Sequence, residues 1–364
     1  MKVHGDRLRA WSRGSGRARG LVLAVASAAV AAVALAGIGS ASAAQSHPLK
    51  ARASGGLKKG LNVYVVPKLL GAAYFTVADS AKSGGAIAGL MKLGEKGTET
   101  SGSAATPASE LPAIQAAIAK GANGLIVSAT DPTALCPTLK SAMARGITVV
   151  TYDSDAPTCR DLFVNQASTA QIGTSEVDII AKEMHDKGQL GIVSAAASAT
   201  NQNAWIGYMK KELKKYPKIK LVDIVYGNDD PTTATQVTEG LLQKYPNLTG
   251  IISPTTVGIV AAAGVIDTKQ YRGKVHLTGL GTPLSMKKYV EDGTVQAFEL
   301  WNPANLGYLA AYALVNYASH KITGKQGQKF SAGKLGTFTI GPNKTVLLGP
   351  PTVFTKKNIN QFHF

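Results

Sequence analysis

The stretch GITVVTYDSDAPTCRDLFVNQ, residues 146–166, decides the fold class. An apolar run that begins at Ile147 leads directly into a polar cluster containing Asp153 and Asp155. Buried strands of parallel sheets have continuous apolar sequences rather than alternating ones. In open α/β sheets, ligands bind beyond the carboxyl ends of the strands. The stretch therefore predicts a buried parallel strand, with Asp153 placed where a ligand-binding carboxylate would lie.

Similar strands alternate with helices along most of the chain. Predicted strands cover 61–66, 124–128, 147–152, 190–194, 221–226, 250–253, 275–280 and 295–300, with short strand-like pieces at 337–340 and 346–348. Predicted helices cover 74–90, 111–120, 131–145, 172–185, 203–215, 233–244, 258–266 and 306–319. This alternation indicates α/β architecture, with doubly wound parallel sheets and helices on both faces. Two series of such units, before and after residue 156, predict two lobes.

The N-terminus has the pattern of a secretory signal peptide. A basic leader precedes 18 uncharged, alanine-rich residues, Leu21 to Ile38, and the small-residue pattern Ala41-Ser42-Ala43 follows. A membrane anchor is the alternative, because 18 apolar residues can span a bilayer; the weak hydrophobicity of alanine and the A-x-A site favour cleavage. We expect a signal peptide over 1–43, a flexible basic segment over 44–60, and an exported protein. No cysteine lies near the cleavage site, so we expect no lipid anchor.

The charge of the chain does not identify a nucleic-acid-binding protein. The formal net charge is +17, and removal of residues 1–43 leaves 33 basic and 21 acidic residues, a net charge of +12. Basic stretches can bind nucleic acid, but export argues against that partner, and the basic residues are scattered. A solvated lysine-rich surface or attraction to an anionic cell envelope explains the charge instead.

The two cysteines, Cys136 and Cys159, suggest a disulfide. Cysteines in an exported protein usually pair, and both residues would lie near the carboxyl ends of neighbouring strands. A reactive thiol is the alternative. Arg160 is the one neighbour in sequence that could lower a thiol pKa, so the structural role is favoured.

Recognisable catalytic motifs are missing. The chain has no phosphate-binding loop, no complete dinucleotide fingerprint after Gly279 and no G-x-S-x-G elbow around Ser194 or Ser253. Its six histidines form no metal-spaced pair. We therefore expect no enzymatic activity, no cofactor and no metal site.

A polar or aromatic group recurs just beyond the predicted strands. Carboxylates, amides and an ammonium group supply the donors and acceptors that hydroxyl groups require, and aromatic rings cover apolar C–H faces. These groups predict a polyhydroxylated ligand. The candidate ligand-binding residues are Lys68, Tyr74, Phe75, Asp153, Asp155, Asn201, Gln202, Pro254, Thr255, Thr256, Trp301 and Asn302, and Trp205 follows one of the same strands.

Several candidates have a purely structural alternative. Lys68 could be a surface lysine, and Tyr74 could pack in the core. Asp155 could cap a turn or a helix, and Asn203 could cap the helix that it opens.

At these residues the chain resembles the periplasmic substrate-binding proteins of the ribose-binding type, and most closely the branch that binds rhamnose and autoinducer-2. The matching segments are VPKLLGAAYF (66–75), SATDPTALCPTLKSAMARG (128–146), TYDSDAPTCR (151–160), FVNQA (163–167), NQNAW (201–205), KYPNLTGIISPTTVGI (244–259), LTGLGTP (277–283), LWNPANLGYLA (300–310) and LLGPPTVFTKKNINQFHF (347–364). They cover essentially all of the expected mature chain.

The resemblance implies two lobes joined by a three-segment hinge, which close on a ligand. We expect the N-terminal lobe to comprise 61–156 plus 284–322 and the C-terminal lobe 157–283 plus 323–364. The implied function is that of an ABC transporter solute-binding protein, a monomer that delivers a small sugar-like ligand to a permease with a cytoplasmic ATPase.

The resemblance also bears on the ligand. Lys68, Asp153, Gln202 and Pro254 match residues that hold the ligand in autoinducer-2 binders, and the paired cysteines are a trait of those proteins. Asn201, however, replaces an aspartate and Thr256 replaces an alanine, as in rhamnose-type members. An amide can donate as well as accept, whereas an ionised carboxylate only accepts. We expect a rhamnose-like sugar, with autoinducer-2 as the alternative ligand.

Two further functions fit parts of the pattern. A signalling receptor component could use the same cleft to report a ligand to a membrane partner, and the sequence does not separate sensing from transport. A transcription regulator of the sugar-repressor class would need a helix-turn-helix, which residues 1–60 do not show.

Overall fold

The computed structural model describes residues 56–364. Its first lobe contains one parallel sheet, in which the strands lie in the order β13-β5-β4-β3-β1-β2. The bounds of these strands are β1 (Asn62–Val66), β2 (Lys96–Glu99), β3 (Gly124–Val127), β4 (Thr148–Tyr152), β5 (Leu162–Asn165) and β13 (Thr345–Leu347).

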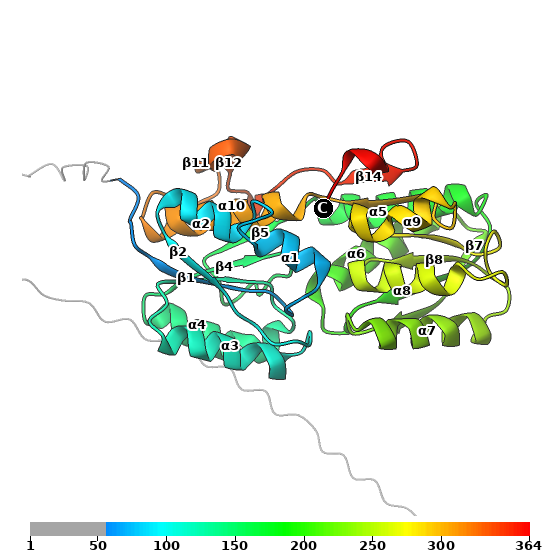
Figure 1. The fold of residues 1–364 in the computed structure, drawn as a ribbon, viewed down its shortest axis with the longest axis horizontal. Coiled ribbons are helices and arrows are strands. Elements are labelled where there is room, and N and C mark those ends of the chain that lie inside the picture. Colours follow the sequence, from blue (N-terminus) through cyan, green and yellow to red (C-terminus); the bar gives the residue numbers. More distant parts are fainter. Residues whose placement is uncertain (1–55) are drawn as a thin grey trace, which may run out of the picture. The chain divides into compact units, whose positions relative to one another are not determined.

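Helices cover both faces of this sheet. Figure 1 shows α3 and α4 on one face and α2 and α10 on the other. Alternate residues of β1 serve the two faces: Val63 and Val65 join the core beneath α2 and α10, whereas Tyr64 and Val66 join the core beneath α3 and α4. The helices are α1 (Ala73–Asp79), α2 (Ala86–Leu93), α3 (Pro107–Ala119), α4 (Pro132–Ala144) and α10 (Pro303–Ala318), and an antiparallel ribbon of β11 (Lys329–Ser331) and β12 (Thr337–Thr339) packs against α10.

The second lobe has the same layered plan. Four parallel strands lie in the order β7-β6-β8-β9, and a bridge from Leu280 to Glu299 connects this sheet to β10, which pairs antiparallel with β14. Its strands are β6 (Gly188–Ser194), β7 (Ile219–Tyr226), β8 (Leu248–Ser253), β9 (His276–Gly279), β10 (Ala297–Leu300) and β14 (Thr352–Thr355). Its helices are α5 (Thr169–Glu183), α6 (Thr200–Glu212), α7 (Pro231–Lys244), α8 (Thr256–Ile266) and α9 (Pro283–Glu291). Short 3-10 helices complete the described chain: η1 (Leu213–Lys215), η2 (Gly333–Leu335), η3 (Pro342–Lys344) and η4 (Ile359–Gln361).

The chain passes between the lobes three times, but not at the boundaries predicted from the sequence. The crossings lie at 166–168, 301–302 and 348–351, between β5 and α5, β10 and α10, and β13 and β14. The predicted boundaries fell at 156, 283 and 322. The observed crossings differ from these boundaries because β5 and β13 complete the first sheet, whereas α9 and β10 belong to the second lobe. A sequence pattern marks a strand but does not reveal which sheet it joins.

One predicted helix is two helices. A turn at Ser80–Gly85 separates α1 from α2, so a single helix over 74–90 does not form. Gly85 permits this turn: a Cβ there would lie 2.1 Å from the carbonyl oxygen of Ala78. By contrast, Asp131 caps α4 as predicted, accepting hydrogen bonds from the backbone nitrogens of Thr133 at 2.8 Å and Ala134 at 3.2 Å.

The first lobe begins slightly before the predicted residue 61. Leu57 packs against the core, and the backbone nitrogen of Lys58 donates to Ser319 Oγ at 2.8 Å. The last part of the predicted flexible segment 44–60 is therefore attached to the lobe. The predicted signal peptide lies outside the described residues. None of the helices in residues 56–364 combines the length and apolar character that crossing a bilayer requires.

Candidate functional site

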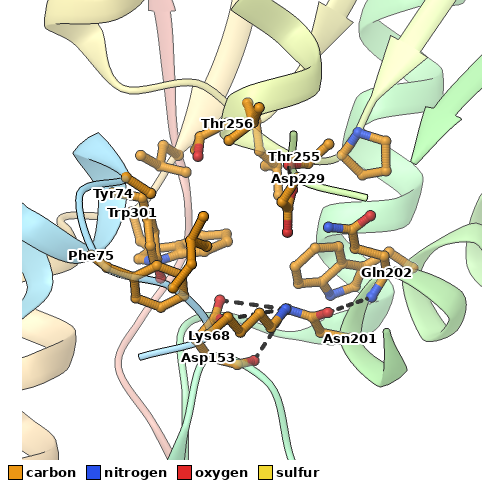
Figure 2. Close-up of a pocket in the computed structure, with 17 residues that line it drawn as sticks. Lys68, Tyr74, Phe75, Asp153, Asn201, Gln202, Asp229, Thr255, Thr256 and Trp301 are labelled. Atoms are coloured by element: carbon orange, nitrogen blue, oxygen red, sulfur yellow. Dashed lines mark hydrogen bonds and ion pairs between the residues drawn. The ribbon is translucent and has the colours of Figure 1, made fainter. Parts of the chain in front are cut away.

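A pocket of about 440 Å³, including its open mouth, lies between the two lobes beyond the carboxyl ends of their strands. Figure 2 shows polar groups facing aromatic rings across the pocket. The lining residues are Lys68, Leu69, Ala72, Tyr74, Phe75, Asp153, Asn201, Gln202, Trp205, Asp229, Pro254, Thr255, Thr256, Val257, Leu280, Leu300 and Trp301.

Asp153 follows β4 directly and lies at the first-lobe side of the pocket. Its carboxylate accepts a hydrogen bond from Ser128 Oγ at 2.7 Å, and Lys68 Nζ lies 3.6 Å from its Oδ2 atom. Both charged side chains are buried, with 6% of Asp153 and 4% of Lys68 exposed. A buried ion pair with an additional hydroxyl donor is held in a defined geometry, so Asp153 and Lys68 present an acceptor and a donor at fixed positions.

The backbone at Asp153 adopts a left-handed conformation, with φ of 59°. Aspartate tolerates this region better than most residues. The Cys136–Cys159 disulfide joins α4 to the loop that follows Asp153. The disulfide predicted from the sequence is therefore present, and it anchors the segment that turns Asp153 toward the pocket.

Asp155 does not line the pocket, which corrects its assignment as a ligand-binding residue. Its carboxylate accepts from Thr151 Oγ1 at 2.6 Å and from Arg160 Nε at 2.8 Å and Nη2 at 2.9 Å. Arg160 in turn donates to the backbone oxygen of Asn343 at 2.9 Å. Asp155 therefore stabilises the loop through hydrogen bonds to Thr151 and Arg160. This structural role is closer to the predicted alternative, a cap of a turn or helix, than to ligand binding.

Aromatic side chains form the wall beside this ion pair. Trp301 Nε1 donates to the hydroxyl of Tyr74 at 2.8 Å, and the two rings meet edge to face with centroids 6.1 Å apart. Phe75 packs edge to face on Tyr74, at 5.1 Å between centroids, and Trp205 approaches Trp301 at 6.1 Å. Interlocked rings of this kind give a rigid apolar surface.

Asn302 lies next to Trp301 in sequence but outside the pocket. Its side chain caps α10 by accepting from the backbone nitrogen of Asn305 at 3.2 Å. Asn302 was predicted to contact the ligand, but it is not among the residues that line the pocket, and the start of α10 uses its side-chain oxygen.

A second carboxyl group lies behind the aromatic wall. Asp79 is fully buried, and the hydroxyl of Tyr152 lies 2.8 Å from its Oδ1 and 3.0 Å from its Oδ2. Burial raises the pKa of Asp79 well above its usual range, although the bond from Tyr152 opposes that rise. Burial also raises the pKa of Tyr74, with the Asp153 carboxylate acting in the same direction. Tyr74 therefore remains a neutral phenol.

The second lobe contributes amide groups from the start of α6. Gln202 Oε1 accepts from Ser194 Oγ at 2.6 Å and from the backbone nitrogen of Ala195 at 2.7 Å. This fixes the amide so that Nε2 is available as a donor at the pocket. Asn201 lies next to it, and its Nδ2 is 3.5 Å from Asp153 Oδ1.

Asp229, which is not among the residues predicted from the sequence, also lines the second-lobe wall. It follows β7 by three residues, in left-handed backbone with φ of 51°, and its Oδ1 accepts from Thr255 Oγ1. Burial raises the pKa of Asp229, whereas Lys68 opposes that rise. The rule that selected Asp153, a polar group beyond a strand end, would also have selected Asp229.

Direct hydrogen bonds connect the lobes at one edge of the pocket. Thr200 Oγ1 donates to the backbone oxygen of Asp155 at 3.1 Å, and Ser198 Oγ donates to that of Thr130 at 3.4 Å. The loops that carry Asp153 and the start of α6 therefore meet in this structure.

Ten of the twelve predicted residues gather in one pocket, which also contains Asp229 and Trp205. Pro254, Thr255 and Thr256 approach from the β8–α8 connection. The arrangement offers carboxylates, amides, hydroxyls and one ammonium group around an aromatic wall. Within residues 56–364, no group of three or more histidine, cysteine, aspartate or glutamate side chains could hold a metal ion.

Residues 63–322 match the family model described as the periplasmic binding protein domain. The chain belongs to this family. The family members are non-enzymatic solute-binding proteins of transport systems, and they work outside the cytoplasm. The two α/β lobes have the type I periplasmic binding protein fold.

Solved structures similar to this one include sugar-transporter proteins. A sugar ABC transporter protein from Actinomyces odontolyticus is 42% identical, with coverage of 84% of this chain and 98% of that chain and a TM-score of 0.65. An ABC transporter solute-binding protein from Clostridium phytofermentas with bound L-rhamnose is 34% identical, with coverage of 84% and 99% and a TM-score of 0.80. LsrB from Clostridium saccharobutylicum in complex with AI-2, or autoinducer-2, is 28% identical, with coverage of 84% and 100% and a TM-score of 0.78. The chain is therefore a solute-binding protein of the sugar ABC transporter type.

Proposed function

We propose that this protein binds a small rhamnose-like sugar between its lobes and delivers it to a membrane permease driven by a cytoplasmic ATPase. The observation that carries the proposal is the pocket itself. Lys68 and Asp153 lie on one side and Gln202 and Asp229 on the other, and aromatic rings line the pocket beside them. Directional donors and acceptors match ring hydroxyls, and aromatic rings match the C–H faces between them. The L-rhamnose-bound relative supports the choice of sugar.

Closure of the lobes on the ligand is the proposed mechanism. Side chains from both lobes line the pocket, so a ligand that contacts both walls has more contacts in the closed state. A ligand shifts such an equilibrium by its differential affinity for the two states. Solution X-ray scattering should show a smaller radius of gyration when the ligand saturates the protein. An unchanged radius would contradict the mechanism.

Autoinducer-2 is the second candidate ligand, for uptake or for sensing. The similarity to the AI-2-bound LsrB supports it, as do Lys68, Asp153, Gln202 and Pro254, which all line the pocket. Asn201 and Thr256 favour the sugar, because they stand where the autoinducer-2 binders resembled by this sequence have an aspartate and an alanine. The amide adds a hydrogen-bond donor and the threonine adds a hydroxyl at the second-lobe wall.

The deciding experiment is a thermal-shift and calorimetric comparison of L-rhamnose and autoinducer-2. A ligand present at 100 times its dissociation constant stabilises the folded state by about 2.7 kcal/mol, which gives a measurable shift. A shift with L-rhamnose alone supports the sugar, and a shift with autoinducer-2 alone supports the alternative. Failure of both ligands, and of a wider panel of neutral sugars, would overturn the proposed function.

Export as a monomer without a lipid anchor belongs to the same proposal. Expression of the full chain should yield a secreted protein whose N-terminus is Ala44, and light scattering should give the mass of one chain. Retention of residues 1–43 in the membrane fraction would favour the anchor instead.

A further inference from the structure

Asp229 introduces a negative charge that Lys68 and Asp153 do not balance. The lining side chains that carry formal charge are Lys68, Asp153 and Asp229. Lys68 lies 3.6 Å from Asp153 Oδ2, so these two charges offset each other on the first-lobe wall. Asp229 stands on the opposite wall, where its protein partner is the neutral hydroxyl of Thr255.

The geometry of Asp229 suits contact with a ligand. Figure 2 shows its carboxyl group directed into the pocket. Oδ1 accepts the Thr255 hydroxyl, which leaves Oδ2 to accept from a ligand. The charge of Lys68 acts on Asp229 across the pocket, as does that of Asp153. The carboxylate therefore lies within electrostatic reach of anything bound between the walls.

We infer that Asp229 is a specificity-determining residue, which accepts a ligand hydroxyl and selects neutral sugars against the corresponding sugar acids. This inference rests on the proposed sugar-binding function and assigns its substrate class. A hydroxyl group can donate to Oδ2, and hydrogen bonds to charged groups are the stronger ones. A ligand carboxylate would add a second unbalanced negative charge, and like charges brought together at an interface are strongly unfavourable.

The decisive variant is Asp229→Asn. Asparagine has nearly the same shape, tolerates left-handed backbone and can still accept the Thr255 hydroxyl through Oδ1. The substitution removes the charge and places an amide donor in the pocket. We expect a 10- to 100-fold weaker affinity for L-rhamnose. We also expect the ratio of L-rhamnose to L-rhamnonate affinity to fall at least tenfold, because the repulsion is lost.

Two further variants separate this role from a structural one. Asp230→Asn is the matched control, because Asp230 is the next residue, is exposed and caps α7 with its side chain, a role that asparagine retains. It should leave both affinities unchanged. Thr255→Val removes the hydroxyl that holds Asp229 but keeps the charge. This variant should still reject L-rhamnonate, even where its affinity for L-rhamnose falls.

Isothermal titration calorimetry with both ligands decides among the outcomes. Wild-type affinity and wild-type discrimination in Asp229→Asn would overturn the inference, while the proposed function would stand. Loss of discrimination in Asp230→Asn as well would also overturn it, because the effect would then not depend on the pocket. If the wild-type protein binds no neutral sugar, the proposed function itself fails.

Discussion

The two walls of the pocket differ in how their polar groups are held. On the first-lobe side, the Asp153 carboxylate accepts a hydrogen bond from Ser128 and forms an ion pair with Lys68. The Tyr74 hydroxyl accepts a hydrogen bond from the Trp301 indole. On the second-lobe side, one end of each polar group is fixed and the other faces the pocket, as in Gln202 and Asp229. The first wall is therefore a cross-linked platform, whereas the second wall supplies contacts that a ligand completes.

Both lobes also have carboxyl groups in their interiors, and these groups receive different numbers of hydrogen bonds. In the first lobe, Oε2 of buried Glu110 accepts from the backbone nitrogen of Thr130 at 3.0 Å and from the Thr130 hydroxyl at 2.6 Å, whereas Oε1 has no hydrogen-bond partner. In the second, neither carboxyl oxygen of buried Glu176 has a hydrogen-bond partner, and the Glu299 carboxyl group lies within its electrostatic reach. Buried polar groups without partners destabilise a fold. Both lobes therefore have buried carboxyl groups whose protonation should influence stability, and Glu299 is one of those in the second lobe.

The largest expected effect separates Asp153 from Asp155. Asp153→Ala should weaken sugar binding by at least about 100-fold, because it removes an acceptor and leaves Lys68 without its partner. Asp155→Ala should mainly lower stability, by about 1–3 kcal/mol, because Arg160 loses its acceptor. Calorimetry and urea unfolding of both variants measure the two effects. Equal affinities in Asp153→Ala and the wild type would remove Asp153 from the site.

Removal of the disulfide tests whether the first wall must be cross-linked. The double variant Cys136→Ser, Cys159→Ser opens a loop that spans a sequence separation of 23 residues. It should lose about 3 kcal/mol of stability in the chain-entropy model. Affinity should fall severalfold, because the loop that carries Asp153 gains freedom. Full affinity in a folded double variant would contradict this expectation. It would mean that the loop that carries Asp153 keeps its conformation without the disulfide, through hydrogen bonds such as those of Asp155.

The effect expected at the second wall is about 1.4 kcal/mol, which is smaller than the loss of stability expected on removal of the disulfide. Gln202→Glu keeps the acceptor atoms but removes the Nε2 donor, so sugar affinity should fall about tenfold. Gln243→Glu, an exposed position on α7, is the control and should change nothing. Unchanged affinity in Gln202→Glu would mean that Gln202 shapes the wall without donating to the ligand.

The smallest effect concerns pH and the interior of the second lobe. Burial raises the pKa of Glu299 from 4.5 to about 7, so the folded protein retains a proton that the unfolded chain releases. The stability from this group is fully present below pH 4.5 and is lost as the pH rises through about 7. Glu299→Gln should flatten the dependence of stability on pH in this window, as measured by urea unfolding. An exposed control, Glu291→Gln, should keep the wild-type profile, and an unchanged profile in Glu299→Gln would contradict the prediction.

Much of the pocket could be predicted because its residues follow strand ends. Asp153, Gln202 and Trp301 were selected by that rule, and all three line the pocket. Asp155 and Asn302 satisfy the same rule but are used by Arg160 and by the start of α10. Sequence position places a side chain near the cleft, whereas its local hydrogen bonds decide whether it faces the ligand.

The sequence by itself determined the alternation of strands and helices, the family resemblance and the cysteine pair, because periodicity and motifs are local properties of the chain. Only the tertiary structure decided which sheet each strand joins, where the three crossings lie and that Asp229 faces Lys68 across the pocket. Strands β5, β10 and β13 are four residues or fewer, and strands this short carry too little pattern to specify their neighbours. Their pairing depends on contacts between residues far apart in the sequence, which form only when the lobes are assembled.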